Sequence, residues 1–198
     1  MKNIIIGLTG PTGAGKTSAC QAAADVGFKV VDCDKLARVA VEKGTAGLRA
    51  VTKAFGEEIL KPDGTLNRKK LAVKAFSTKE NTELLNKTLL PHIVELIKKE
   101  TDAERVLLDA PTLFESGIVS ICVSTIAVLA DEDIRLDRIM KRDGIDKESA
   151  MLRIKAGKPN EYYFKNAEHI IYNNCEQTAF KAEFMAIINK ILKENYRV

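Results

Sequence analysis

Hydrophobic residues gather in five short runs rich in β-branched side chains, each bounded by polar or glycine-containing segments. These runs cover residues 3–8, 28–31, 105–108, 124–129 and 169–172. Their hydrophobicity is continuous rather than alternating, which is typical of strands buried on both faces of a parallel sheet. The longest mostly apolar stretch, residues 118–130, is also predicted as strand, because it is too short for the roughly 20 residues of a membrane helix.

Helical periodicity fills most of the intervals between these runs. Residues 16–26 follow the first run almost directly, and residues 179–193 carry apolar side chains at the spacing of one helix face. Alternating strands and helices predict an α/β fold with a mainly parallel sheet. We therefore expect one compact unit in which a five-stranded parallel sheet is flanked by helices.

One interval is much longer than the others. About 70 residues separate the second run from the third, which is more than a single crossover helix needs. We interpret this interval as an inserted helical subdomain. Within it, Asn67 is the predicted N-cap of a helix through Phe76, a second helix is expected around residues 81–88, and Pro91 is placed at the start of a further helix.

Composition excludes several classes of protein. The 198 residues carry 31 basic and 27 acidic side chains, and the resulting +4 is too small and too scattered to indicate a nucleic-acid or membrane-surface protein. Four cysteines form no CxxC pair and only two histidines accompany them, so neither a disulfide framework nor a zinc site is indicated. We expect a reduced, cytoplasmic setting, no nucleic-acid or membrane partner, and a monomer or weak homo-oligomer.

The strongest motif lies between the first strand and the first helix. Residues 10–17 read Gly-Pro-Thr-Gly-Ala-Gly-Lys-Thr and fit the phosphate-loop pattern GxxxxGK[ST], whose backbone N–H groups surround nucleotide phosphates. Lys16 is expected to reach the β- and γ-phosphates, and the Thr17 hydroxyl to ligate Mg²⁺. The residues predicted to bind ATP are Thr12, Gly13, Ala14, Gly15, Lys16 and Thr17. The alternative is a glycine-rich turn with a surface lysine.

Two carboxylates, Asp32 and Asp34, follow the second strand at the sheet edge where ligands bind in α/β proteins. Being two residues apart, they share one side of an extended chain. If one strand separates theirs from the first, the gap is about 10 Å, which leaves room for a γ-phosphate and an acceptor hydroxyl. The alternative is that one or both cap a helix beginning near Lys35.

Other segments narrow the class of nucleotide-binding protein. The only Asn-Lys pair, Asn86-Lys87, lacks the aspartate of the guanine-reading NKxD segment, so a GTPase is disfavoured. Residues 106–109 end in an aspartate in the manner of a Walker B strand, although Asp109 before Pro111 also suits a turn.

Three arginines are spaced for one face of a helix that ends near Gly144. They are Arg135, Arg138 and Arg142, at positions i, i+3 and i+7. Together with the basic residues of segment 153–158 they are typical of a cationic lid that closes over phosphates. A solvated charged face is the alternative.

Two further motifs are specific to one family. Residues 63–68 read Asp-Gly-Thr-Leu-Asn-Arg, and residues 111–115 read Pro-Thr-Leu-Phe-Glu. With the phosphate loop, the Asp32-Cys33-Asp34 segment and the Arg142-Asp143-Gly144 segment, they make the chain resemble the dephospho-coenzyme A kinase family. The resemblance implies a P-loop fold like that of nucleoside-monophosphate kinases. Its expected parts are a core (about 1–35 and 104–198), a helical acceptor-binding insertion (about 36–103) and a short lid (about 141–159).

The resemblance also implies an activity. It is the transfer of the ATP γ-phosphate, with Mg²⁺, to the ribose 3′-hydroxyl of dephospho-coenzyme A. The implied catalytic residues are Asp34, Lys16 and Arg142, and the implied acceptor contacts are Asp34, Arg38, Leu113 and Phe114. The sequence departs from the family pattern at Pro11, Leu90, Gly157, Tyr172 and Cys175. A kinase for another small alcohol or nucleoside monophosphate, and a non-catalytic nucleotide-binding regulator, remain as alternatives.

Overall fold

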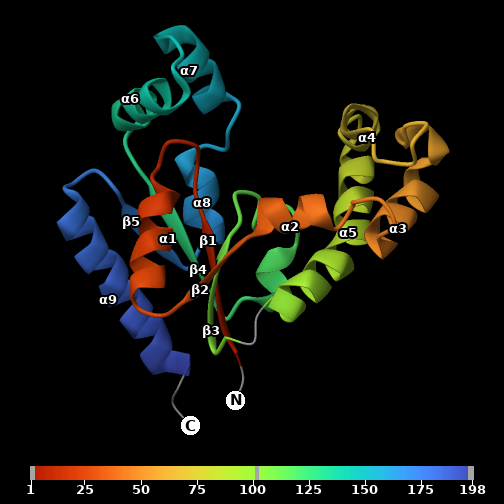
Figure 1. Cartoon of the computed structure of the whole chain (residues 1–198). Helices are drawn as coiled ribbons and strands as arrows, with labels where there is room; N and C mark the ends of the chain where they lie inside the picture. Colours follow the sequence, from red (N-terminus) through yellow and green to blue (C-terminus); the bar gives the residue numbers. More distant parts are fainter. Residues whose placement is uncertain (1–2, 101–102, 196–198) are drawn as a thin grey trace. The chain divides into compact units, whose positions relative to one another are not determined.

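The structure is a computed structural model that describes residues 3–100 and 103–195, so the outer ends of the predicted core lie outside the described residues. The chain divides into two compact units (Figure 1). The core unit comprises Met1–Val31, Ala103–Pro111 and Cys122–Val198, and the helical unit comprises Asp32–Asp102 and Thr112–Ile121. Among the described residues, no helix is both long and apolar enough to cross a membrane.

All five predicted strands are confirmed and form one sheet. They are β1 (Ile4–Thr9), β2 (Lys29–Asp32), β3 (Arg105–Asp109), β4 (Ser124–Leu129) and β5 (His169–Tyr172), in the order β2-β3-β1-β4-β5. Strand β1 pairs in parallel with both β3 and β4, and β4 pairs in parallel with β5. One strand, β3, therefore lies between β2 and β1, and this is the condition on which the predicted gap between Asp34 and the phosphate loop depends.

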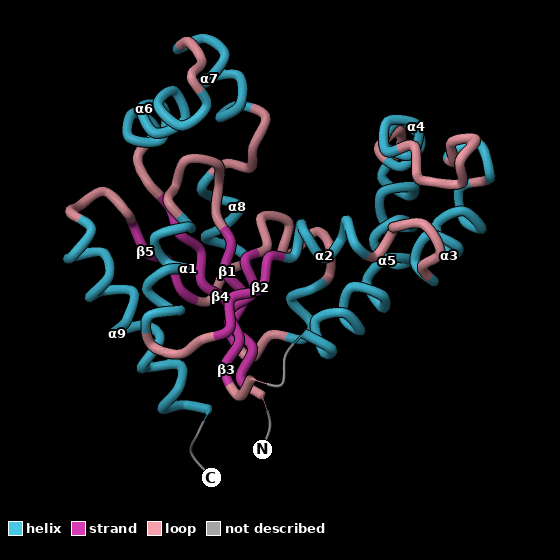
Figure 2. The backbone as a smooth tube through the Cα atoms, viewed as in Figure 1, coloured by secondary structure: helices cyan, strands magenta, loops and turns pink. Residues whose placement is uncertain are grey.

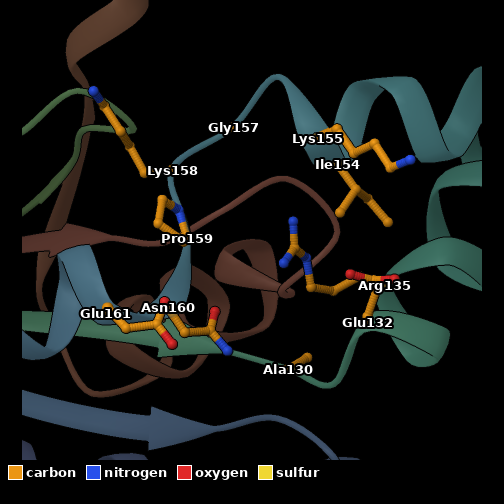
Figure 3. A pocket seen from close by; sticks show the side chains of 10 residues that line it. All are labelled: Ala130, Glu132, Arg135, Ile154, Lys155, Gly157, Lys158, Pro159, Asn160 and Glu161. Atoms are coloured by element: carbon orange, nitrogen blue, oxygen red, sulfur yellow. The ribbon is translucent and has the colours of Figure 1, made fainter.

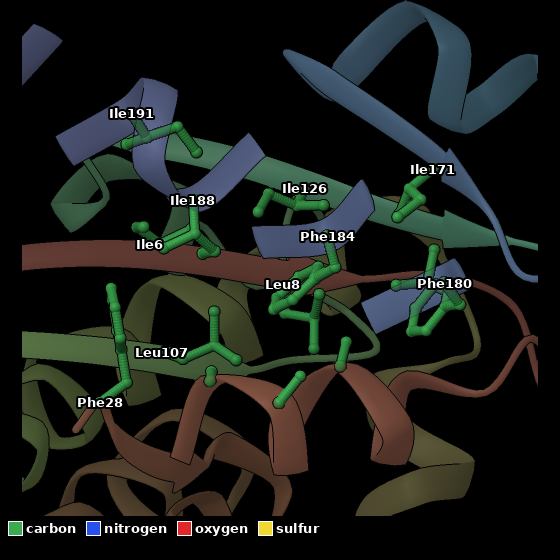
Figure 4. Close-up of a cluster of buried hydrophobic side chains, with 14 of the residues drawn as sticks. Ile6, Leu8, Phe28, Leu107, Ile126, Ile171, Phe180, Phe184, Ile188 and Ile191 are labelled. Atoms are coloured by element: carbon green, nitrogen blue, oxygen red, sulfur yellow. The ribbon is translucent and has the colours of Figure 1, made fainter. Parts of the chain in front are cut away.

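Helices cover both faces of the sheet, which explains the continuous hydrophobicity of the strands. On one face, α1 (Lys16–Asp25) and α9 (Gln177–Asn195) enclose the main hydrophobic cluster, in which Phe180 stacks on Phe184 (Figure 4). Alternate residues of β4 serve the two faces: Ile126 belongs to this cluster, whereas Leu129 packs with Tyr163 of α8 (Asn160–Asn166).

The prediction of strand over residues 118–130 is wrong at its N-terminal end. Ile118–Ile121 forms the 3-10 helix η2, and β4 begins only at Ser124. The apolar run crosses from one unit to the other. Residues 118–121 belong to the helical unit, whereas the part from Ser124 onward belongs to the core unit. After β4, helix α6 (Glu132–Asp143) ends at Gly144 as predicted and is followed by α7 (Lys147–Lys155).

The helical unit has a core of its own. It contains α2 (Cys33–Val39), α3 (Ala46–Phe55), the 3-10 helix η1 (Glu57–Ile59), α4 (Arg68–Ala75) and α5 (Lys79–Glu100). The buried side chains of its cluster are Val41, Leu48, Val51, Phe55, Ile59, Leu66, Leu71 and Ala75. The predicted cap is confirmed, because the Asn67 side chain accepts a hydrogen bond from the backbone N–H of Lys70 at 3.1 Å.

The helix predicted around residues 81–88 is confirmed, but the prediction of a new helix start at Pro91 is wrong. One helix, α5, runs through both segments with Pro91 in its interior. Proline there removes one intrahelical hydrogen bond and crowds the preceding turn, which normally bends or breaks a helix. Figure 2 shows α5 changing direction along its length instead of ending. Its burial against α3, α2 and α4 outweighs the local cost.

Candidate active site

The phosphate loop, residues 10–17, leads from β1 into α1, as the motif requires. Gly10 and Gly15 have φ values of 141° and 94°, which other residues rarely adopt. A Cβ atom at Gly10 would lie 2.1 Å from the carbonyl oxygen of Val128, and one at Gly15 would lie 2.1 Å from Nδ2 of Asn173. Backbone conformation and close packing therefore both require glycine at these positions.

Side chains hold the carbonyl groups of this loop. Arg135 Nε donates to the Thr12 carbonyl at 2.9 Å, and Lys16 Nζ donates to that of Gly10 at 2.8 Å. The Ala14 carbonyl accepts from two side chains, Arg138 Nη1 at 3.2 Å and Asn173 Nδ2 at 3.1 Å. Carbonyls turned toward these donors suit a loop whose N–H groups face a bound phosphate, so the loop is already shaped for a nucleotide.

Arg135 is an interior residue rather than part of a solvated face. Its side chain is only 6% exposed, and burial lowers the pKa of its guanidinium, an effect opposed by Tyr163 and Glu132. Arginine nevertheless stays charged at neutral pH. Figure 3 shows Arg135 among the residues that line a cavity of about 360 Å³ beside the loop, together with Ile154 and Asn160.

Arg138 links the loop to the segment after β5. Besides the Ala14 carbonyl, it contacts the Asn173 carbonyl, to which Nη2 donates at 2.9 Å. Asn173 is buried, and Asn174 accepts from the backbone N–H of Asp131 at 2.9 Å. The sequence predicted no role for these asparagines, and the arginine spacing predicted a lid. In this structure Arg135, Arg138 and Asn173 are supports of the phosphate loop.

Arg142 differs from the other two arginines of α6. Its side chain is 58% exposed and forms a two-point contact with the adjacent Asp143, at 2.7 Å and 2.9 Å. Arg153 of α7 also pairs with this carboxylate. These arginines lower the pKa of Asp143, Arg142 contributing most. The ion pairs and a small apolar cluster around Ile139 tie α7 to α6, within the segment predicted as a lid.

The residues near the loop fit a magnesium ion. The Thr17 hydroxyl is exposed in the first turn of α1, and Asp109 ends β3 at the position paired with Leu8 of β1. Among the described residues there is no cluster of three or more histidine, cysteine, aspartate or glutamate side chains suited to a metal. Mg²⁺ in nucleotide sites needs no such cluster, since phosphates and water supply most of its ligands.

The two carboxylates after β2 do not share one side of an extended chain, and that prediction is wrong. Asp32 ends the strand and caps α2, its side chain accepting from the backbone N–H of Lys35 at 2.9 Å. Asp34 already lies in the first turn of α2, and Arg38 follows one turn later; both are exposed. Asp32 therefore follows the capping alternative, and the acceptor-side role of Asp34 stays a prediction.

The other predicted acceptor contacts belong to the helical unit as well. Leu113 is fully buried, whereas the following Phe114 is half-buried. Asn86 of α5 donates from Nδ2 to the carbonyl of Glu115 at 2.6 Å, which fixes this segment. Leu113 thus anchors the turn, and Phe114 is the member of the pair that solvent can reach.

A parallel sheet in the order β2-β3-β1-β4-β5, with a phosphate loop after β1 and arginines on the helix after β4, defines a phosphotransferase of the P-loop kinase class. The chain shares this fold with shikimate kinase from Acinetobacter baumannii, with a TM-score of 0.54 and 15% identity over 98% of this chain and 96% of that one. At that identity the likeness concerns the fold alone.

The chain belongs to the dephospho-CoA kinase family, whose model matches residues 4–179. It is 39% identical to the dephospho-CoA kinase of Fusobacterium nucleatum over 178 residues, which cover 88% of this chain and 91% of that protein. Among solved structures, protein TT1252 from Thermus thermophilus superposes with a TM-score of 0.75 at 29% identity, over 96% of this chain and 98% of that one.

Proposed function

We propose that the protein transfers the γ-phosphoryl group of ATP to the ribose 3′-hydroxyl of dephospho-coenzyme A, giving ADP and coenzyme A. This is the final step of coenzyme A synthesis. The observation that carries the proposal is the family match over residues 4–179, because that segment contains the phosphate loop, Asp34 and Arg142. The structure supports the proposal as well, because Arg135 and Asn173 hold carbonyl groups of the phosphate loop by hydrogen bonds.

On the donor side, the loop binds the ATP phosphates through its N–H groups and the N-terminus of α1. Lys16 balances charge on the β- and γ-phosphates, and the Thr17 hydroxyl, with Asp109 nearby in the sheet, would hold Mg²⁺. When bound, Mg²⁺ neutralises charge that develops on the phosphate oxygens. The loop needs little rearrangement for this task because its carbonyls are already held.

On the acceptor side, Asp34 receives the 3′-hydroxyl as a hydrogen-bond donor and orients its oxygen for attack. Because the transition state of phosphoryl transfer is loose, orientation contributes more than early removal of the proton. Arg142 is proposed to stabilise the charge of the transferring group. Arg38 and Phe114 are proposed acceptor contacts, with Leu113 holding Phe114 from the interior.

The proposal is tested by measuring ADP release with a panel of acceptors: dephospho-coenzyme A, AMP, shikimate and gluconate. We expect turnover with dephospho-coenzyme A to exceed that with each of the others by at least about 100-fold, because the other acceptors lack most of its binding groups. A preference for another acceptor would identify a different small-molecule kinase. ATP binding without transfer to any acceptor would identify a nucleotide-binding regulator.

A further inference from the structure

The helical unit contains an apolar groove between α2, α4 and α5. Its volume is about 190 Å³, and its apolar walls include Val41, Leu66, Phe76, Leu85 and Leu89. Leu85 and Leu89 also pack against the core of this unit, so the floor of the groove is anchored. All of these residues belong to the helical unit, and the groove is therefore a property of that unit alone.

Phe76 is exposed in a way that the fold does not explain. It follows the last turn of α4 and is 67% exposed, although aromatic side chains contribute most to stability when they are buried. Single exposed apolar residues are common, but this one forms the wall of a groove whose other members are apolar. A ligand with an apolar chain would cover it.

Two arginines line the same groove. Arg38 and Arg68 are exposed, and Arg68 Nη2 donates to the Arg38 carbonyl at 3.3 Å, which brings the two residues together. Within residues 3–100 and 103–195, neither guanidinium forms an ion pair with a carboxylate. Two arginines that line one groove and, in the described part of the chain, form no ion pair with a carboxylate suit a phosphate or diphosphate, which a guanidinium binds at two points.

The order of these groups matches the order of groups in the proposed acceptor. Asp34 and Arg38 are four residues apart in α2, so they share a face and lie about 6 Å apart along the axis. In dephospho-coenzyme A, the 3′-hydroxyl is followed across the ribose by the 5′-diphosphate and then by the pantetheine arm. In the helical unit, Asp34 lies one turn of α2 before Arg38, and Arg38 and Arg68 line the apolar groove.

We propose that Arg38 and Arg68 bind the diphosphate of dephospho-coenzyme A and that the groove beside Phe76 binds its pantetheine arm. The inference rests on the proposed function and deepens it, because it names the groups that distinguish this acceptor from smaller alcohols. Arg38 and Arg68 then supply charge recognition. Phe76 and the leucines of α5 recognise the carbon chain of the arm.

The test compares two variants with matched controls on the same helix. Arg68→Met removes a groove cation, and its control Lys69→Met removes the neighbouring exposed cation that lies outside the groove. Phe76→Asp places a charge in the groove, and its control Val73→Asp places one at a site that is 70% exposed and outside the groove. Thermal unfolding of all four variants shows that each is folded.

We expect Arg68→Met and Phe76→Asp each to raise the KM for dephospho-coenzyme A by about 10- to 100-fold, with little change in the KM for ATP. The two controls should stay within about twofold of the unaltered protein. A second probe is 4′-phosphopantetheine, which has the arm and one phosphate but no ribose. It should inhibit competitively against dephospho-coenzyme A, with a Ki raised at least about tenfold in both groove variants.

The outcomes separate this inference from the proposed function. If the unaltered protein does not phosphorylate dephospho-coenzyme A, the proposed function fails and the inference falls with it. If the protein is active but both groove variants keep KM and Ki values like those of their controls, the groove is not the arm site. In that case the inference is overturned and the proposed function stands.

Discussion

The phosphate loop and the candidate acceptor residues are built in opposite ways. The loop offers backbone groups whose carbonyls are held by Arg135, Arg138 and Asn173, two of which are themselves buried. The acceptor residues Asp34 and Arg38 are exposed side chains on the short helix α2. Many contacts therefore hold the loop proposed to bind the nucleotide, whereas the proposed acceptor site relies on exposed side chains that would lose conformational freedom when a substrate binds.

This difference predicts two kinds of mutant phenotype. Changes at loop supports should disturb ATP binding and stability together, because the same contacts serve both. Changes at acceptor residues should alter turnover or the acceptor KM while the fold keeps its stability, since exposed side chains contribute little to it.

Asp34→Asn should lower kcat by about 10²- to 10⁴-fold, because the amide cannot orient and accept the proton of the 3′-hydroxyl as a carboxylate does. ATP affinity, measured by calorimetry, should change by less than about twofold. Asp32→Asn is the matched control, since asparagine also caps a helix and the residue is otherwise exposed. Equal losses in both variants would remove the role proposed for Asp34.

Lys16→Ala should lower kcat/KM for ATP by about 10²- to 10³-fold, because one donor to the transferring phosphate is lost. Part of this loss in kcat/KM should come from distortion of the phosphate loop, because Lys16 also donates a hydrogen bond to the Gly10 carbonyl. Lys16→Arg should not restore activity, because the bulkier, planar guanidinium cannot occupy the place of the compact ammonium. Full activity in the arginine variant would show that charge alone is needed.

Asn173→Ala should raise the KM for ATP by about tenfold and destabilise the protein by about 1–2 kcal/mol, because the buried Ala14 carbonyl loses one of its donors. The adjacent Asn174→Ala removes a contact to the backbone N–H of Asp131 and none to the loop, so its KM for ATP should be nearly unchanged. Steady-state kinetics and thermal unfolding measure both effects. If the two variants gave the same KM, Asn173 would have no special part in shaping the loop.

Asn67→Ala should lower stability by about 1 kcal/mol, and Tm by about 2–4 °C, because α4 loses its N-cap. Asn67→Asp should retain the cap and the Tm. ATP affinity is expected to be the same in all three proteins, since the change is confined to the helical unit. Calorimetric binding of ATP alongside the unfolding curve checks both statements. A weaker ATP affinity in Asn67→Ala would break the contrast between the two units.

The smallest expected effect concerns pH. The pKa of Asp143 is lowered by Arg142 and then by Arg153, so the carboxylate is charged, and its ion pairs persist, throughout the neutral range. Their contribution to stability is complete above the ordinary aspartate pKa of about 3.9 and is lost as the pH falls through the lower folded value. Asp143→Asn should therefore differ from the unaltered protein in unfolding at pH 7 and match it near pH 2.

Local signals predicted much of this molecule. Each strand is a continuous apolar run because both sheet faces are covered, and the phosphate loop is dictated by glycines that no other residue can replace without a clash. The Asn67 cap is equally local, since it needs only a short polar side chain before a helix. The family and the activity followed from the resemblance carried by residues 63–68 and 111–115 together with the phosphate loop. The oligomeric state stays a prediction.

What the sequence could not supply depends on distant contacts. Pro91 stays within a helix because α5 is packed against α2, α3, α4 and η2, which no local rule reveals. Residues 118–121 are apolar like a strand but serve the helical unit. Arg135 has the spacing of a surface residue, and its partner, the Thr12 carbonyl, is 123 positions away. Helix α2 starts at Cys33, two residues before the start near Lys35 that the sequence suggested, and this turn redirects Asp34.

The shared carboxylate of Asp143 has a consequence for how a charged group is released. Because both Arg142 and Arg153 pair with this carboxylate, Asp143 would keep one cationic partner if Arg142 turned toward a phosphoryl group, as its proposed role requires. The pair with Arg153 and the apolar cluster around Ile139 would still join α7 to α6.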